Sequence, residues 1–400
     1  MGALLRHFRD LDLAEEAFQE ACLRALKSWP KNGPPRDTVA WLVLVGRNAA
    51  LDGLRKRSRE RELPGEEAIS DLSDAEGRLA DQLDGEDYRD DLLRLLFMCC
   101  HPELPATQQI ALALRIVCGL TVPEIARAFL VTDVAMEQRI TRAKKLVAAE
   151  QIPFEAPGAP ERAERLSAVA AALYLLFNEG YSATGGSAHV RVPLCDEAIR
   201  LARLVLRLFP GEPEMLGLTA LMLLQHSRSA ARLDAQGAIV LLEDQDRGAW
   251  DRDRIGEALA LLDKALRHGK PGPYQVQAAI AALHARAPRF EDTDWAEIEQ
   301  LYAALERLQP SPVVSLNRAV AVAKLRGPDA ALALVDALAN DLSGYFYFFG
   351  VRGALLMDLG RADEAREAFD RALALAKSPA EAAHIRLQLD RLTRTKGAAT

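Results

Sequence analysis

Small residues recur at one helical spacing through the second half of the chain, and this pattern constrains the fold more than any other feature. The spacing A-x3-[AF]-x2-[AV] begins at Ala198 and Ala365, and a close variant begins at Ala258. Small side chains are needed where paired helices cross closely. We therefore predict an all-α fold with four to five degenerate helix-pair repeats in residues 160–398. Residues 227–255 are predicted to be an insertion within one repeat.

A helix-turn-helix pattern precedes the repeats, between Leu120 and Val147. Thr121 is a predicted N-cap, residues 130–132 form the turn, and residues 133–147 form the second helix. Helical periodicity places three apolar residues inward: Met136, Ile140 and Ala143. The same periodicity places six residues outward: Glu137, Gln138, Thr141, Arg142, Lys144 and Lys145. This clean separation favours DNA contact over an ordinary solvated helix.

The sign of the charge changes along the N-terminal third. Residues 1–60 carry eleven Lys and Arg against eight Asp and Glu, whereas residues 61–91 carry three against twelve. The net charge of −7 therefore hides local basic segments, which are what phosphates meet. Periodicity predicts helices over 13–29 and from about 37 to 54, separated by a break that begins at Pro30. Further helices are predicted over 90–100 and 106–118, with Gly119 as a cap.

Several function classes are excluded by composition. The five cysteines form no C-x-x-C pair, and Cys99, Cys100 and His101 point in different directions on a helix, so buried reduced thiols are expected rather than a metal site. No run of eighteen apolar residues occurs, so we expect a cytoplasmic protein with no membrane span. Without a phosphate loop, paired metal ligands or a nucleophile with a spaced base, neither an enzyme nor a cofactor is expected.

The order of the N-terminal helices resembles region 2 of the extracytoplasmic-function (ECF) sigma factors. The matching residues are Asp12, Ala14, Glu15, Glu16, Gln19, Glu20, Leu23, Arg24, Trp41, Leu42, Arg47, Asn48, Asp52, Arg55, Lys56 and Arg57. This resemblance implies that the first helix docks on the β′ clamp helices of RNA polymerase. It also implies that the loop Lys31 to Asp37 captures a base flipped out of the −10 element.

Site residues follow from this resemblance. The implied polymerase contacts are Asp12, Glu15, Glu16, Gln19 and Glu20. The implied −10 contacts are Lys31, Asn32, Arg36, Asp37, Trp41, Arg47, Asn48, Arg55, Lys56 and Arg57. Family members have about one more helix before the acidic one, whereas only Gly2 to Asp10 precede it here. We therefore expect part of the region 2 core to be missing, through truncation or a misplaced start.

The helix-turn-helix resembles ECF region 4, whose second helix enters the major groove at the −35 element. This implies base-edge roles for Gln138, Thr141 and Arg142, and phosphate contacts for Arg139, Lys144 and Lys145. The full implied set also contains Thr132 and Glu137. Glu137 departs from the basic residue common in the family, and could accept a hydrogen bond from cytosine N4. The β flap is the implied polymerase contact of this region.

Five short polar motifs lie among the repeats, at residues 177–184, 244–251, 272–277, 292–295 and 312–318. In this order they resemble the C-terminal region of one ECF group, which carries a tetratricopeptide extension. Regulatory residues are expected among Asn178, Glu179, Tyr181, Asp244, Gln245, Asp246, Arg247 and Trp250. Several of them could converge with His226 as an enzyme site, but such residues also satisfy loop backbones. A structural or ligand-sensing role is favoured.

The sequence thus predicts four segments: region 2 in 1–60, an acidic linker in 61–89, region 4 in 90–150 and repeats in 160–398. The predicted function is that of a sigma factor that binds core polymerase and promoter DNA, with the repeat domain modulating activity through an intramolecular or protein contact. Two alternatives remain. One is a different helix-turn-helix regulator whose repeats bind an effector or peptide, and the other is a structural repeat scaffold.

Overall fold

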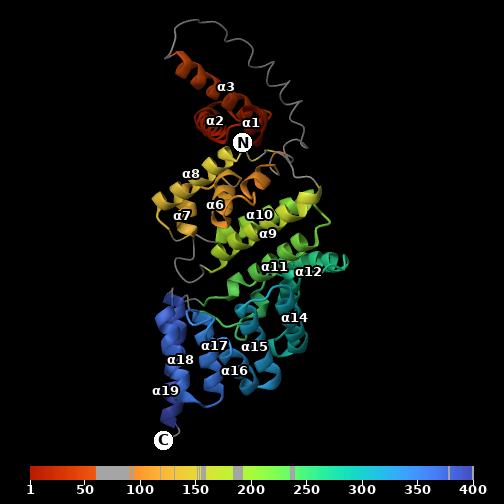
Figure 1. Cartoon of the computed structure of the whole chain (residues 1–400), viewed down its shortest axis with the longest axis vertical. Helices are drawn as coiled ribbons and strands as arrows, with labels where there is room; N and C mark the ends of the chain where they lie inside the picture. Colours follow the sequence, from red (N-terminus) through yellow and green to blue (C-terminus); the bar gives the residue numbers. More distant parts are fainter. Residues whose placement is uncertain are drawn as a thin grey trace. The chain divides into compact units, whose positions relative to one another are not determined.

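The structure is a computed structural model, and it describes residues 1–59, 91, 94–117, 119–129, 131–150, 152, 154, 159–182, 192–234, 239–376 and 379–398. Helices dominate these ranges, which contain no strand (Figure 1). The only strand-like pairing among them is an isolated antiparallel bridge between Leu233 and Ile239. The predicted all-α fold is confirmed. The chain divides into two compact units, Met1–Leu175 and Leu176–Thr400.

The first unit contains one group of helices in residues 1–59 and a second group in residues 94–175. Its helices are α1 (Gly2–Phe8), α2 (Leu11–Asn32), α3 (Thr38–Arg59), α6 (Ala106–Ile116), α7 (Val122–Ala128), α8 (Asp133–Ala149) and the greater part of α9 (Ala159–Ser182). Residues 94–99 are also helical, as predicted. Helix α1 packs on α2 and α3 and buries Leu4 and Leu5. The boundary between the units lies inside α9, later than the predicted start of the repeats.

Helices α2 and α3 approach at the level of their backbones. A Cβ at Gly46 would lie 2.8 Å from the carbonyl oxygen of Ala17 and 3.1 Å from Leu4 Cδ1. Only glycine leaves room for this crossing, and Ala14, Ala17 and Ala21 on α2 are buried at the same face. Small residues on both helices therefore set the spacing of this pair.

The end of α2 differs from the prediction. The helix continues two residues beyond Pro30, to Asn32. Its C-cap is Gly33, which has a φ of 76° and donates its N–H to the carbonyl of Trp29. A proline removes one backbone donor, and the loss is small in the last turn, where tertiary packing of the preceding residues holds the helix. The left-handed glycine, rather than the proline, ends the helix.

The second unit is a succession of packed helices. They are α10 (Val192–Leu208), α11 (Pro213–His226), α12 (Arg252–Leu266), α13 (Pro273–Arg286), α14 (Trp295–Leu308), α15 (Pro312–Arg326), α16 (Pro328–Asp336), α17 (Phe346–Asp358), α18 (Ala362–Leu375) and α19 (Pro379–Ala398), and the last residues of α9 precede them. Four consecutive pairs, α11 with α12 through α17 with α18, pack along their lengths. Figure 1 shows these helices following one another from α10 to α19. None of the described helices is both long and apolar enough to cross a membrane.

The recurring small residues lie in the cores of these pairs. The positions Ala198, Ala202, Val205, Ala258, Leu262, Ala265, Ala365, Phe369 and Ala372 are all at most 2% exposed. Between α11 and α12, where an insertion was predicted, the described residues form two 3₁₀ turns, at Ser229–Ala231 and Arg247–Ala249, and the isolated bridge.

One of the five polar motifs holds two helices together. Glu214, in the first turn of α11, accepts hydrogen bonds from the backbone N–H groups of Tyr274 and Gln275 at the start of α13. It also accepts one from the side-chain amide of Gln275, which is 1% exposed. A carboxylate at a helix N-terminus satisfies free donors and opposes the helix dipole. This motif therefore has a structural role.

Candidate nucleic-acid interface

Side-chain caps mark the starts of both helices of the helix-turn-helix, α7 and α8. Thr121 and Glu124 form a reciprocal capping box at the start of α7: the Glu124 carboxylate accepts from Thr121 N at 2.7 Å, and Thr121 Oγ1 accepts from Glu124 N at 3.4 Å. Thr132 caps α8 by accepting from Ala135 N at 3.2 Å. Met136, Ile140 and Ala143 are buried as predicted, so the rotation of α8 is fixed by its apolar side.

The opposite side of α8 is exposed. It presents Glu137, Gln138, Thr141, Arg142 and Lys145. Within the described residues, neither Arg142 nor Lys145 has a carboxylate within ion-pair distance, so both cations are available to an anionic partner. Arg139 is half-buried and lies 5.7 Å from the centroid of the Phe129 ring, which stabilises the junction of the two helices.

Lys144 was predicted to lie on the exposed face of α8, but its side chain is largely buried. Its Nζ lies 2.7 Å from Asp12 Oδ1 and 2.5 Å from Glu15 Oε2, both on α2, and only 17% of its side chain is exposed. Arg115, at the end of α6, reaches the other oxygen of Glu15 at 2.7 Å. Burial disfavours the charge on Lys144, but its bonds to Asp12 and Glu15 outweigh this and raise its pKa. Periodicity alone could not reveal carboxylates far away in the sequence.

The acidic side of α2 is therefore divided. Glu15 has 13% of its side chain exposed and faces Lys144 and Arg115. Glu16 and Gln19 are exposed, and Gln19 donates to Glu15 across one turn. Glu20 pairs with Arg24 on the surface of the same helix. Thus Glu16 and Gln19 of the implied polymerase face are exposed to solvent, whereas Glu15 forms ion pairs with residues of α6 and α8.

The predicted −10 residues separate into structural and accessible groups. Asp37 accepts from Val39 N and Ala40 N at 2.9 Å each, so it is a cap of α3. Lys31, Asn32 and Arg36 are exposed beside it, and Asn48 is half-buried on α3. Arg55, Lys56 and Arg57 continue α3, but their side chains lie outside the described part of the chain.

Two tryptophans flank this loop. The rings of Trp29 and Trp41 meet edge to face at a centroid distance of 5.4 Å. Trp29 Nε1 and Arg47 Nε are buried and have no hydrogen-bond partner within the described residues. Sequence reasoning did not select Trp29, although its position one residue before the Pro30 break was visible. The two rings therefore lie at the two ends of the loop that carries the exposed Lys31 and Arg36.

Three family models match the chain. Residues 1–60 match sigma-70 region 2 and residues 94–147 match sigma-70 region 4. These two domains indicate an RNA polymerase sigma factor. Residues 165–266 match a family of unknown function (DUF6596). An uncharacterized protein of Rhizobium meliloti (strain 1021) is 70% identical over 392 residues, covering 98% of this chain and 93% of the relative.

The sigma-70 regions support promoter recognition in transcription initiation as the general role of the chain. Sigma factors of this family take part in transcription initiation without being enzymes, and their partners are core polymerase and promoter DNA. The region 4 match ends at Val147, on α8, and the region 2 match includes α1, α2 and α3. Both matched segments lie in the first compact unit of this sigma factor.

The second unit of the sigma factor contains a cluster of arginines and aromatic rings, which we call the arginine cluster: Tyr181, Arg228, Arg232, Arg247 and Trp250. Arg232 stacks on the Tyr181 ring at 3.8 Å and donates to its carbonyl. Arg228 donates to the Tyr181 hydroxyl at 3.0 Å and lies 5.8 Å from the Trp250 ring. Arg247 lies 4.9 Å from the same ring. The structure therefore brings together Tyr181, Arg247 and Trp250 from two separate motifs.

The remaining candidates of that unit have local roles. Asp246 caps the turn Arg247–Ala249, Gln245 donates to the carbonyl of Val240, and Asp244 is exposed. Asn178 is half-buried, and the side chain of Glu179 lies outside the described part.

His226 lies in a group that has the composition of a hydrolase triad. Its ring nitrogens lie 3.0 Å from Asp196 Oδ1 and 2.7 Å from Ser229 Oγ. However, Ser229 Oγ also lies 2.6 Å from the carbonyl of His226 itself, as in a helix-end turn, and Arg254 shares the Asp196 carboxylate. Burial and the charge of Arg254 lower the pKa of His226. The group closes the end of α11 and ties it to α10 and α12.

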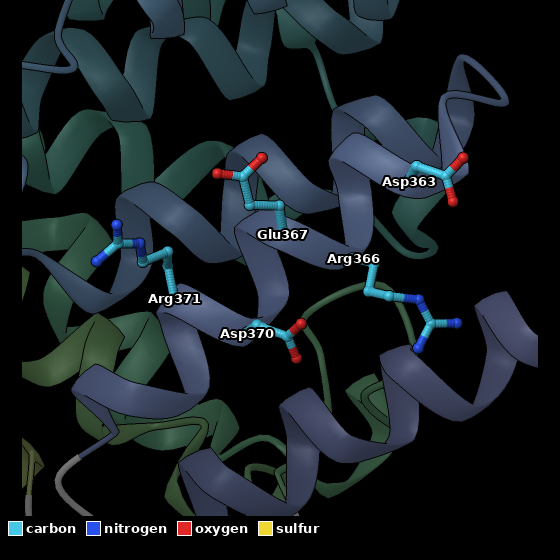
Figure 2. Close-up of a pocket in the computed structure, with 5 residues that line it drawn as sticks. All are labelled: Asp363, Arg366, Glu367, Asp370 and Arg371. Carbon is cyan, nitrogen blue, oxygen red and sulfur yellow. The ribbon is translucent and has the colours of Figure 1, made fainter.

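A shallow hollow of about 420 Å³ lies on the surface of α18, and Figure 2 shows the side chains that line it. It is lined by Asp363, Arg366, Glu367, Asp370 and Arg371, which all belong to this one helix. Their mixed charges and the lack of an apolar wall are typical of a solvated helix face. The hollow has none of the features of a ligand site.

Proposed function

We propose that this sigma factor is of the extracytoplasmic-function type, acts in the cytoplasm, and reads the −35 element with α8. The observation that carries this proposal is the exposed polar face of α8, where Arg142 and Lys145 have no ion-pair partner in the described chain. This face lies directly above three buried anchors that fix its rotation. A positioned polar helix face of this kind suits the major groove.

Individual roles follow from position along α8. Gln138, Thr141 and Arg142 lie where side chains reach base edges, and Arg142 suits a bidentate contact with guanine. Lys145 lies one residue later and suits a phosphate contact. Glu137 would repel phosphate, and suits acceptance of a hydrogen bond from cytosine N4. Thr132 caps the helix, and its exposed edge suits a backbone contact.

Paired variants of α8 test this proposal. Arg142→Ala should cost about 1–3 kcal/mol of binding free energy and relax the preference at one −35 position. Lys145→Ala should weaken all sequences alike and reduce the salt dependence. Electrophoretic titration against single-base variants of a promoter measures both effects. Equal, sequence-independent losses for the two variants would exclude base reading by Arg142.

The exposed part of α2 is the proposed polymerase face. Glu16, Gln19 and Glu20 lie on it, and charge reversal of Glu16 and Glu20 to Lys should abolish co-purification with core polymerase. Binding to an isolated −35 duplex should persist, because α8 is untouched. Retained core binding would favour a different kind of helix-turn-helix regulator. Promoter-dependent transcription with purified core polymerase then tests the complete function.

For the second unit we propose a tetratricopeptide-like fold that modulates transcription through the arginine cluster. This is supported by the buried small residues of the helix pairs and by a cluster that joins residues of α9 to the insertion between α11 and α12. Tyr181→Phe removes only the hydroxyl that Arg228 contacts, whereas Tyr181→Leu also removes the ring beneath Arg232.

The two Tyr181 variants separate regulation from stability. Tyr181→Leu should change promoter-dependent transcription several-fold, and Tyr181→Phe should change it less, while the thermal midpoint and −35 binding stay close to those of the unaltered protein. A change in transcription that merely follows the loss of folded protein would show that the cluster is structural.

A further inference from the structure

The arginine cluster gathers three positive charges. Arg228, Arg232 and Arg247 have no ion-pair partner among the described residues. Arg254 and Arg318, which are half-buried in the same unit, each contact two carboxylates instead. Charged side chains that leave water are normally paired, because an unpaired charge is costly away from solvent. Within the described part of the chain, the cluster therefore lacks the negative charge that the other two arginines have.

Arg247 is the least exposed of the three arginines. It is 7% exposed, and its Nη1 donates to the carbonyls of His284 and Ala287. Its Nη2 and the Nε1 of Trp250 are buried and have no hydrogen-bond partner in the residues that the structure describes. Burial, and then the charge of Arg228, lower the pKa of Arg247. A bound anion nearby would oppose both effects.

The positive field of the cluster reaches neighbouring side chains. Burial, followed by the charges of Arg228 and Arg247, lowers the pKa of His284 to about 4. Glu291 and Asp292 act on Arg247 only from beyond ion-pair distance, and Asp292 already pairs with a neighbouring arginine. These two carboxylates therefore do not neutralise the cluster.

Arg228 and Arg232 meet at one tyrosine. Arg228 donates to the Tyr181 hydroxyl at 3.0 Å, and the Arg232 guanidinium lies 3.8 Å from the centroid of the same ring. Phe177 stacks on that ring at a centroid distance of 5.5 Å and helps to hold it in place. A guanidinium has five N–H donors, and each of these two arginines uses one of them within the described residues. The remaining donors can bind the oxygen atoms of a ligand.

We propose that the arginine cluster is a binding site for the phosphate group of a small molecule. Arg228 and Arg232 donate to the phosphate oxygens, because their planar guanidinium groups match the spacing of those oxygens. Buried Arg247 adds a third positive charge, which favours a doubly charged anion over a singly charged one. The proposal deepens the proposed regulatory role of the cluster, and rests on that role only for the effect of binding on transcription.

The covered position of the cluster favours a small anion over a nucleic-acid strand. Nucleic acids are bound by exposed cations that follow the strand and by rings on which bases stack. Arg228 and Arg232 are half-buried, and the rings of Tyr181 and Trp250 are in contact with arginines. These rings therefore orient the guanidinium groups, and the part of the ligand that is recognised is its anionic group.

Calorimetric titration of the full-length protein at constant ionic strength tests the site. Inorganic phosphate and glycerol phosphate, doubly charged at about pH 8, should bind saturably, whereas acetate should bind far more weakly. The tighter of the two phosphate probes identifies the source as a free ion or an ester. Arg228→Gln should weaken phosphate binding by about ten- to a hundredfold. Arg267→Gln is the matched control, because it removes the same charge from an exposed position of the same unit, and should leave the affinity unchanged.

A chemical test on the unaltered protein does not depend on the folding of a variant. Phosphate should slow the modification of Arg228 and Arg232 by phenylglyoxal, but not that of Arg267, as measured by mass spectrometry. Unchanged rates at Arg228 and Arg232, no saturable binding of either phosphate probe, equal affinity for acetate, or equal losses in the two Gln variants would overturn the site. Phosphate binding that leaves promoter-dependent transcription unchanged would instead contradict the proposed regulatory role alone.

Discussion

Alanine at Gly353 should destabilise the second unit, whereas alanine at Gly350, three residues earlier on α17, should stabilise it. Both glycines are helical, and neither has a positive φ. A Cβ at Gly350 would meet no heavy atom within 4 Å. A Cβ at Gly353 would lie 2.6 Å from Cε1, 2.7 Å from Cδ1 and 3.0 Å from Cζ of Phe369. The pair therefore isolates the close approach of α17 and α18 from helix propensity.

The magnitudes follow from these contacts. Either substitution gains about 0.5–1 kcal/mol from helix propensity. At Gly353 this gain is opposed by overpacking of about 1–3 kcal/mol. The upper half of that range applies, because Phe369 is 1% exposed and its ring cannot move into solvent. We expect Gly353→Ala to lower the free energy of unfolding by about 1–2.5 kcal/mol and Gly350→Ala to raise it by about 0.5–1 kcal/mol.

Calorimetry of the full-length protein measures the difference. For a unit of this size, about 1 kcal/mol corresponds to roughly 2–4 °C in the midpoint, so the two variants, which differ by about 2–3 kcal/mol, should differ by about 4–12 °C. The transition of the second unit should move, and that of the first should not. Equal stabilisation by both alanines would show that α17 and α18 are not packed at glycine distance, and would refute the explanation of the small-residue pattern.

Three further perturbations test other parts of the structure. Glu214→Ala should lower the free energy of unfolding by about 1–3 kcal/mol, because it strips the buried Gln275 and the start of α13 of an acceptor; an unchanged urea midpoint would contradict this. A thiol reagent at pH 8 should modify Cys22 in the native protein but not Cys100, whose pKa burial raises to about 12; equal labelling would contradict it. Burial, aided by nearby arginines, lowers the pKa of His284 to about 4, so stability should fall as the pH decreases from about 6.5 to 4, and His284→Gln should flatten that titration of the unfolding free energy.

Local patterns in the sequence were sufficient to predict the helix-turn-helix. The capping box of Thr121 and Glu124 involves residues three apart, and the buried positions of α8 follow one helical period. The buried alanines of the helix pairs are predictable for the same reason. In each case the physical cause operates over fewer than eight residues.

Interactions between distant residues were not predictable. Lys144 belongs to the exposed set by periodicity, yet it pairs with carboxylates 129 and 132 residues earlier in the chain. Glu214 caps a helix 60 residues later, and Tyr181 meets arginines of an insertion. No periodic signal identifies the partner of a charged or polar residue. The sequence alone therefore does not show whether such a residue is exposed or paired, nor with which residue it pairs.

The contact of α2 with α3 at Gly46 has a mechanical consequence. A carbonyl oxygen packed within van der Waals distance of a neighbouring backbone leaves no deformable side chain between the two helices. The resemblance to sigma region 2 implies that α2 docks on RNA polymerase and that α3 presents Trp41 and Arg47 to the promoter. The docking surface on α2 then sets the angle at which a single-stranded base meets Trp41 and Arg47. No adjustable hinge lies between RNA polymerase and the DNA strand that the polymerase opens.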